Sequence, residues 1–209
     1  MVPDLHYGIS CPTDWVRLPL DSEGGYGSWV EATVSELAER GAVAGYELDR
    51  QVLRKDLKAR ADDSRSRDPL CAFALYPDGF DAALAVLEFD LIHPDGTVPD
   101  ITLDWLEETF SAYDFGRPEC MRTLLPIGPA VRIRQNFAAD DPPPGGPGVL
   151  LETLTYGILP SETVSALVLL LSWTTPGMEE AMEDAAESIA QALTVDRAGT
   201  ARNEHDDIR

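Results

Sequence analysis

Residues 164–174 constrain the fold more than any other part of the sequence. They contain an unbroken apolar run, residues 166–171, which is far shorter than the ~20 residues that a membrane-spanning helix needs. A short apolar run of this kind is typical of a strand that is buried on both faces. We therefore expect this strand to be central in a β-sheet.

Further strand signals occur on both sides of this run. Val131 and Ile133 alternate with Arg132 and Arg134, as a half-buried strand requires. A Pro- and Gly-containing turn at residues 77–81 joins two β-prone segments and predicts a hairpin. Together with the central strand, the predicted strands lie within residues 7–20, 70–76, 82–92, 131–137, 149–158 and 164–174.

Helical periodicity alternates with these strands. Ser28 and Glu31 match a capping box, which predicts a helix over residues 29–40 that ends at Gly41. Asp100 is the expected cap of a helix that reaches residue 113, and Thr175 caps the closing helix with Pro176 in its first turn. The four predicted helices cover residues 29–40, 47–61, 100–113 and 176–193.

Strands joined by short hairpins, with helices inserted between them, predict an α+β fold. We expect an antiparallel β-sheet of about six strands covered by about four helices. With 209 residues the chain is long enough for one sizeable core. We predict a single domain over residues 1–195, with a Pro- and Gly-rich loop at 140–148, and a disordered C-terminal tail at 196–209 because that segment has few apolar residues.

Charge narrows the choice of partners. The formal net charge is −21, so the averaged field repels nucleic acid and anionic membrane surfaces and favours a basic protein partner, although acidity also simply keeps a protein soluble. The N-terminus lacks the pattern of a secretory signal, and we expect a cytoplasmic protein.

The second predicted helix, with the residues just after it, is the one basic segment of the sequence. Its mixed charges predict a solvated surface with weak ion pairs, and the alternative is a phosphate-binding patch formed by Arg50, Arg54, Lys55, Lys58, Arg60, Arg65 and Arg67.

The sequence offers no catalytic, cofactor-binding or metal-binding residue that we can nominate. The histidines, His6, His93 and His205, stand near the N-terminus, at a turn and in the tail, so none is placed to serve a nucleophile. The acidic residues from Asp95 onward lack the order of a calcium loop. The cysteines have no close spacing, which predicts buried reduced thiols at Cys11, Cys71 and Cys120 rather than a disulfide or zinc site.

Tryptophan side chains are the remaining candidates for a binding role. We expect Trp15 and Trp173 to pack in the core, whereas Trp29 and Trp105 stand in the first turns of their helices, where one could be exposed. Exposed tryptophan can anchor an interface.

The order of elements resembles the PsbP-like fold, which is shared by a photosystem subunit, nuclear import factors and many bacterial proteins of unknown role. The resemblance extends over about residues 7–195 and is carried by the segments 11–16 (Cys-Pro-Thr-Asp-Trp-Val), 166–173 (Ala-Leu-Val-Leu-Leu-Leu-Ser-Trp) and 189–193 (Ile-Ala-Gln-Ala-Leu). It implies a non-enzymatic module that binds a protein partner, by analogy at the level of the fold.

Three functions follow as hypotheses. The first is a non-enzymatic adaptor, chaperone-like or immunity-like module whose acidic helices, around residues 100–114 and 179–187, meet a basic partner. The second is a small-ligand carrier or unconventional enzyme with a pocket between sheet and helices, which a deep pocket with converging polar groups would indicate. The third is a structural subunit of a larger assembly, which would present an exposed apolar patch.

Overall fold

The apolar run at residues 166–171 forms most of β8 (Ala166–Trp173), the middle strand of a seven-stranded antiparallel sheet among the residues described. The structure is a computed structural model and describes residues 5–21, 26–113, 115–138, 149–161 and 163–197. The strand order is β2-β3-β4-β8-β7-β6-β5, so β8 has three strands on each side. The prediction of a central strand is confirmed.

The remaining strands of the main sheet lie on both sides of β8. They are β2 (Trp15–Leu18), β3 (Cys71–Leu75), β4 (Ala85–Ile92), β5 (Glu119–Leu125), β6 (Gly128–Ala138) and β7 (Leu150–Ile158). The predicted hairpin of β3 and β4 pairs antiparallel with Phe73 opposite Leu87. A separate two-stranded sheet joins β1 (Leu5–Gly8) to β9 (Thr194–Arg197), so β9 reaches two residues into the range where a tail was predicted.

The mixed α+β class with four helices is confirmed for the described residues, and the helices are longer or shorter than predicted. They are α1 (Tyr26–Val43), α2 (Arg50–Arg67), α3 (Leu103–Phe110) and α4 (Glu179–Gln191). The predicted loop at 140–148 and residues 198–209 of the predicted tail lie outside the described residues.

Several predicted helix ends are wrong, each for a local reason. Helix α1 begins two residues before Ser28, so Ser28 is no N-cap, and the helix runs through Gly41, whose missing side chain makes room for Leu48. The cap of α3 is Thr102, whose hydroxyl accepts from the amide of Trp105 at 3.1 Å, rather than Asp100.

The ends of α2 and α4 also differ from the prediction. Helix α2 begins after Asp49, whose carboxylate accepts from the amides of Gln51 and Val52, and it extends to Arg67. Helix α4 begins at Glu179, because Gly177 at φ +81° forms a turn after Pro176. Thr175 and Pro176 therefore lie before the helix.

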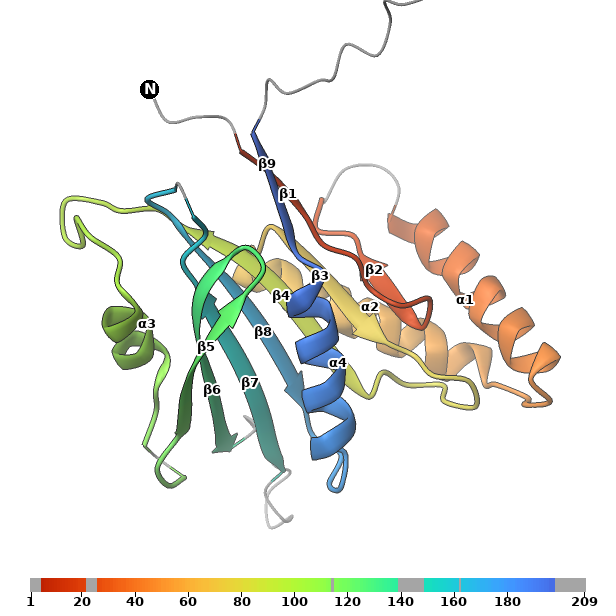
Figure 1. Ribbon diagram of the computed structural model, residues 1–209. Helices are drawn as coiled ribbons and strands as arrows, with labels where there is room; N and C mark the ends of the chain where they lie inside the picture. The colour runs from red at the N-terminus through yellow and green to blue at the C-terminus, as the bar shows by residue number, and fades with distance from the viewer. Residues whose placement is uncertain (1–4, 22–25, 114, 139–148, 162, 198–209) are drawn as a thin grey trace, which may run out of the picture.

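The two faces of the sheet are covered differently (Figure 1). Helix α4 and the β1–β9 sheet lie on one face, which we call the closed face. Its apolar side chains form one large core with α4 that includes Phe73, Leu87, Leu169, Leu171, Trp173, Met182, Ala186 and Ile189. Tyr7 of β1 contacts Phe89 of β4 with ring centroids 6.4 Å apart.

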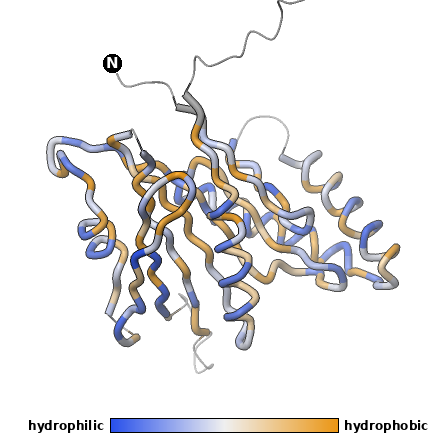
Figure 2. Tube along the Cα trace, viewed as in Figure 1, coloured by the Kyte–Doolittle hydropathy of each residue, from blue (hydrophilic) through white to orange (hydrophobic). Residues whose placement is uncertain are grey.

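The opposite face, which we call the open face, carries the other three helices. Helices α1 and α2 pack on β2 and β3 around Leu37, Leu53 and Tyr76, while α3 packs on β6 and β7 through Leu106. The strands are apolar along most of their length and the outer helix surfaces are hydrophilic (Figure 2). Helix α3 sits close to β7 because that strand has Gly157, where a Cβ would lie 3.2 Å from the Cβ of Leu106.

Candidate functional site

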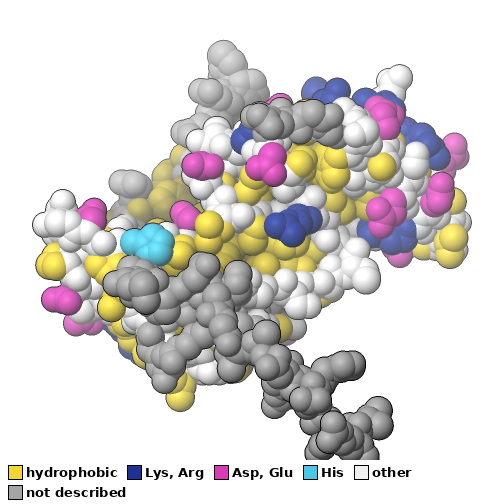
Figure 3. All heavy atoms as spheres, turned by 90° about the horizontal axis from the view of Figure 1, so that it is seen from above, with side chains coloured by type: hydrophobic (Ala, Val, Ile, Leu, Met, Phe, Trp, Pro, Cys, Tyr) yellow, Lys and Arg dark blue, Asp and Glu magenta, His cyan; other side chains and the backbone are white. Residues whose placement is uncertain are grey.

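The open face carries a cavity in the gap between α2 and α3. Its volume is about 540 Å³, within the range of small-molecule sites, and its floor is formed by β4, β8, β7 and β6. One wall is α2, and the other is the C-terminal end of α3 with the two residues after it. In a view along the sheet, hydrophobic side chains gather in a hollow between the part that holds α1 and α2 and the part that holds α3 (Figure 3).

The floor of this cavity is more polar than the centre of a buried sheet usually is. Ser172 of β8 lies opposite Val86 of β4 on one side and Thr153 of β7 on the other, and Thr153 lies opposite Gln135 of β6. Three of four residues in this row across the sheet therefore carry hydrogen-bonding groups. Thr155, which also lines the cavity, belongs to the next row, where it faces Leu170.

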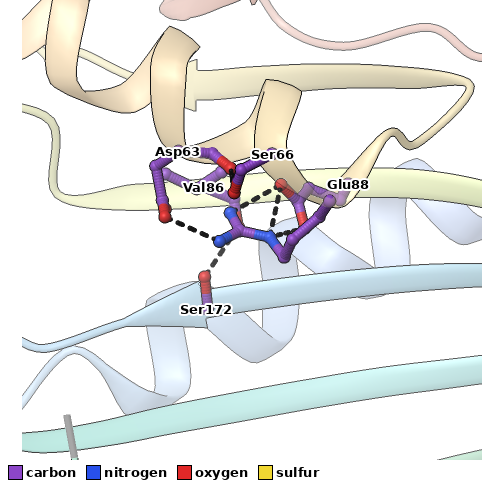
Figure 4. A network of polar contacts seen from close by, with 6 residues as sticks. Asp63, Ser66, Val86, Glu88 and Ser172 are labelled. Atoms are coloured by element: carbon purple, nitrogen blue, oxygen red, sulfur yellow. Dashed lines mark hydrogen bonds and ion pairs between the residues drawn. The ribbon is translucent and has the colours of Figure 1, made fainter. Parts of the chain in front are cut away.

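An ion-pair network stands at the α2 wall. Arg67 donates to the carboxylate of Glu88 through Nε at 2.8 Å and through NH2 at 2.7 Å, and its NH1 lies 2.9 Å from Asp63. Figure 4 shows Asp63 and Glu88 on two sides of this guanidinium group and Ser172 on the neighbouring strand. The hydrogen bonds to Glu88 raise the pKa of Arg67, although burial acts in the opposite direction. Arg67 is thus a fixed cation.

Glu88 is the buried member of that network. Its side chain is only 9% exposed, whereas those of Arg67 and Asp63 are 44% and 57% exposed. A buried carboxylate is costly unless it is paired, so Glu88 requires Arg67. The exposed contact of Arg67 with Asp63 contributes little by comparison.

A second network supports the same wall. The carboxylate of Asp56 accepts from the Tyr76 hydroxyl and from the amide of Ala83, each at 2.8 Å, and lies 3.4 Å from Arg60. Burial, with Asp56 beside it, raises the pKa of the Tyr76 hydroxyl, which therefore stays protonated as the donor. The network ties α2 to the loop before β4, where Ala83 lines the cavity.

The α3 wall is held by one side chain from the floor. The amide group of Gln135 donates to the carbonyl of Phe110 at 2.6 Å and accepts from the amide of Ala112 at 2.7 Å. Because both Phe110 and Ala112 line the cavity, Gln135 fixes the position of this wall relative to β6.

The charged side chains of the cavity lining balance one another. Among the described residues that line it there is no histidine or cysteine, and its four charged side chains, Arg60, Asp63, Arg67 and Glu88, cancel formally. His93 instead contacts the Ser165 hydroxyl at 2.8 Å near the far ends of β4 and β8, outside the cavity. Ser165 is buried, so its hydroxyl is not accessible to a substrate.

The other residues singled out in the sequence lie in varied places. Trp15 and Trp173 are buried, as predicted, and Trp173 also borders the cavity. Trp29 and Trp105 are half-buried and do not line it. His6 belongs to β1, and His205 lies outside the described residues.

The cysteine prediction is correct for one thiol and wrong for another. Cys71 is buried, Cys11 is half-buried and Cys120 is exposed on the edge strand β5, and all three are free. Burial raises the pKa of Cys11 to about 12 and also raises that of Cys71.

Within the described residues, no group of three or more His, Cys, Asp or Glu side chains is arranged to hold a metal ion. Asp95 instead accepts from the amides of Thr97 and Val98 in a tight turn, which lowers its pKa.

The predicted charge clusters are partly paired within the chain. On α2, the expected weak pairs occur between Arg60 and Asp56, Arg65 and Asp62, and Arg67 and Asp63. On the acidic helices, Asp104 and Glu107 bind Arg122, and Glu183 binds Arg132 and Arg134.

The cavity residues were not predicted, although their pattern is visible in the sequence. Ser172 interrupts an otherwise apolar strand, and Glu88 lies between the apolar residues Leu87 and Phe89. Thr153 and Thr155 alternate with Leu154 and Tyr156. Polar residues at every second position of a central strand indicate one face that is not packed against a helix.

Comparisons with known proteins find few matches. No protein-family model matches the chain, and no curated protein sequence matches it. The crystal structure of LpqN, described as involved in cell envelope biogenesis of Mycobacterium tuberculosis, is similar with 12% identity and a TM-score of 0.48, over 92% of this chain and 84% of that one. At this TM-score the similarity carries no argument about function, and the resemblance to the PsbP-like fold is not confirmed. Among the described helices, none is sufficiently long and apolar to span a membrane.

Proposed function

We propose that this protein binds a small, mostly apolar organic molecule in the cavity between α2 and α3. The observation that carries the proposal is the row of polar side chains on the cavity floor, formed by Ser172, Thr153 and Gln135. A folded chain gains the most stability when apolar groups occupy the middle of a sheet. Polar groups kept there beside apolar walls match the usual composition of a ligand site.

The walls support the same proposal because they are held in place before any ligand binds. Gln135 fixes the α3 side, and Asp56 and Glu88 fix the α2 side. A site whose walls are positioned in advance loses less free energy on binding than one that must order them.

The test uses a neutral fluorescent probe, N-phenyl-1-naphthylamine, and a substitution that fills the cavity. We expect the probe to bind with a stoichiometry of about one per chain, as for a single site. Ser172→Phe should abolish that binding because the new ring occupies the floor.

The matched control is Ser161→Phe, at an exposed position outside the cavity, which should bind the probe like the unmodified protein. Circular dichroism and thermal unfolding show whether each variant is folded. Unchanged probe binding by a folded Ser172→Phe variant would refute the proposal.

The adaptor hypothesis, with a cytoplasmic location and a basic protein partner, stays a prediction. Its support is weaker because Asp104, Glu107 and Glu183 already neutralise arginines of the same chain. The unconventional enzyme and the structural subunit of a larger assembly also stay predictions. A pull-down at low and high salt tests the adaptor hypothesis, which requires a basic protein that is lost at high salt.

A further inference from the structure

The cavity has two chemically different ends, and this difference identifies a class of ligand for the site proposed above. The α2 end carries charged side chains, whereas the end near α3 and β6 is lined by Phe110, Phe137 and Leu151. The floor between β4 and β6 spans three strand spacings, which is about 14 Å. An elongated molecule with one polar end matches this shape.

The charges at the α2 end alternate in sign along one side of the helix. Arg60, Asp63 and Arg67 stand at positions i, i+3 and i+7, so they lie on the same helix face, and Glu88 of β4 approaches Arg67 from the sheet. Two positive and two negative side chains line this end of the cavity. A ligand group with a net charge of either sign would therefore face a like charge at this end.

An uncharged hydroxyl group fits the same side chains because it both accepts and donates a hydrogen bond. Glu88 binds the guanidinium of Arg67 through Nε and NH2 and so orients it. The remaining contact, from NH1 to Asp63, joins two exposed side chains and is worth little. A hydroxyl that inserts there accepts from Arg67 and donates to Asp63, so neither partner is left unpaired.

The overall charge adds a second argument against an acidic ligand. At a formal net charge of −21 the field of the protein repels anions at long range. We therefore infer that the cavity binds an uncharged single-chain amphiphile, with a hydroxylated head group between Arg67 and Asp63 and its apolar chain toward Phe110 and Phe137. This inference rests on the proposed function of the cavity.

The test compares three probes with the same eight-carbon chain, each below its micelle-forming concentration: octyl glucoside, octanoate and octyltrimethylammonium. Isothermal titration calorimetry should show octyl glucoside binding at least about tenfold more tightly than either charged probe, a difference of about 1.4 kcal/mol. Equal or tighter binding of octanoate or of the cation would overturn the inference.

A charge-changing variant makes the test specific to the head-group end. Asp63→Asn leaves a net positive charge at this end of the cavity. The affinity for octanoate should therefore rise several-fold relative to the affinity for octyl glucoside, and the affinity for octyl glucoside should fall. Asp62→Asn is the matched control, because Asp62 is the neighbouring exposed carboxylate, pairs with Arg65 and does not line the cavity. It should leave both affinities unchanged, and an identical effect of the two variants would contradict the assigned head-group position.

The two proposals can fail separately. If N-phenyl-1-naphthylamine binds and Ser172→Phe abolishes its binding, but octyl glucoside does not bind, the cavity is a ligand site and the amphiphile inference is wrong. If the neutral dye does not bind either, both proposals are wrong.

Discussion

The two faces of the central strands have opposite compositions although their residues alternate along the same chain. On the closed face, Leu87, Leu171 and Leu154 lie opposite one another on β4, β8 and β7. One residue away, the open face has Val86, Ser172 and Thr153 in the corresponding row. At this row the closed face is covered by α4, whereas the open face borders the cavity between α2 and α3. In this row we therefore expect the closed-face side chains to contribute more to stability than the open-face side chains.

The largest expected effect comes from two neighbouring leucines of β8 that point to opposite faces. Leu171 is fully buried under α4, and Leu170 is half-buried and lines the cavity. Leu171→Ala should lower the free energy of unfolding by about 3 kcal/mol, because the deletion leaves a void in a packed core. Leu170→Ala should cost about 1 kcal/mol, because its side chain borders a cavity that already exists.

Urea denaturation of the two variants measures this difference directly, provided that the denaturant dependence of the free energy is the same in both. Equal losses would mean that the open face is packed as tightly as the closed face, which would remove the basis for a ligand site.

A second comparison concerns two arginines of α2 that make similar bonds to glutamates. Arg67 holds the buried carboxylate of Glu88, and Arg54 holds the exposed carboxylate of Glu31 through Nε at 2.6 Å and NH2 at 2.7 Å. Arg67→Met should lower the free energy of unfolding by about 2 kcal/mol, because it leaves the charge of Glu88 without a partner in a mostly buried place. This is less than for a fully buried pair, since Arg67 itself is 44% exposed.

The control is Arg54→Met. It should change stability little, because the exposed carboxylate of Glu31 stays solvated when its partner is removed. Adding Glu88→Gln to Arg67→Met should restore much of the loss, because the unpaired charge is then absent. A failure of Glu88→Gln to restore stability would show that the loss arises from packing of the arginine stem rather than from charge.

Periodicity was sufficient to predict most of the fold. Six of the seven strands of the main sheet and all four described helices were predicted, from apolar residues that repeat with the period of a strand or a helix, from one unbroken apolar run and from turn residues. Strand β5 was missed because it lies at the sheet edge, where most of its residues are exposed and no alternation is required. The ends of helices were less predictable. Ser28 lies inside α1, and α4 begins after Met178 without a side-chain cap, so Thr175 does not cap it.

The cavity could not be predicted in the same way. Its existence depends on how far apart α2 and α3 pack on the sheet, and this distance follows from side chains that are remote in sequence, such as Leu106 against Gly157. The polar residues of its floor are visible in the sequence, but Ser172 and Thr153 are 19 positions apart. Only the antiparallel register of β7 and β8 brings them together.

The smallest expected effect is a pH dependence that belongs to the closed side of the sheet. Cys11 packs against the closed-face core, and burial raises its pKa from 9.0 to about 12. In the folded chain the thiol stays protonated, whereas in the unfolded chain it ionises above about pH 9. Its contribution to stability is therefore complete below pH 9 and is lost as the pH rises toward 12.

Between pH 8.5 and 9.5 this one group should lower the free energy of unfolding by less than about 1 kcal/mol, because proton linkage is weakened by the partial exposure of the thiol. Cys11→Ala should flatten the decline by that amount, measured by urea denaturation at the two pH values. Cys71 and Tyr156, whose pKa values burial also raises, continue the loss at higher pH. An unchanged slope in Cys11→Ala would mean that the thiol is solvated and that the closed core does not extend to the loop before β2. The contrast between a sealed face and an accessible one would then be weaker at this end of the sheet.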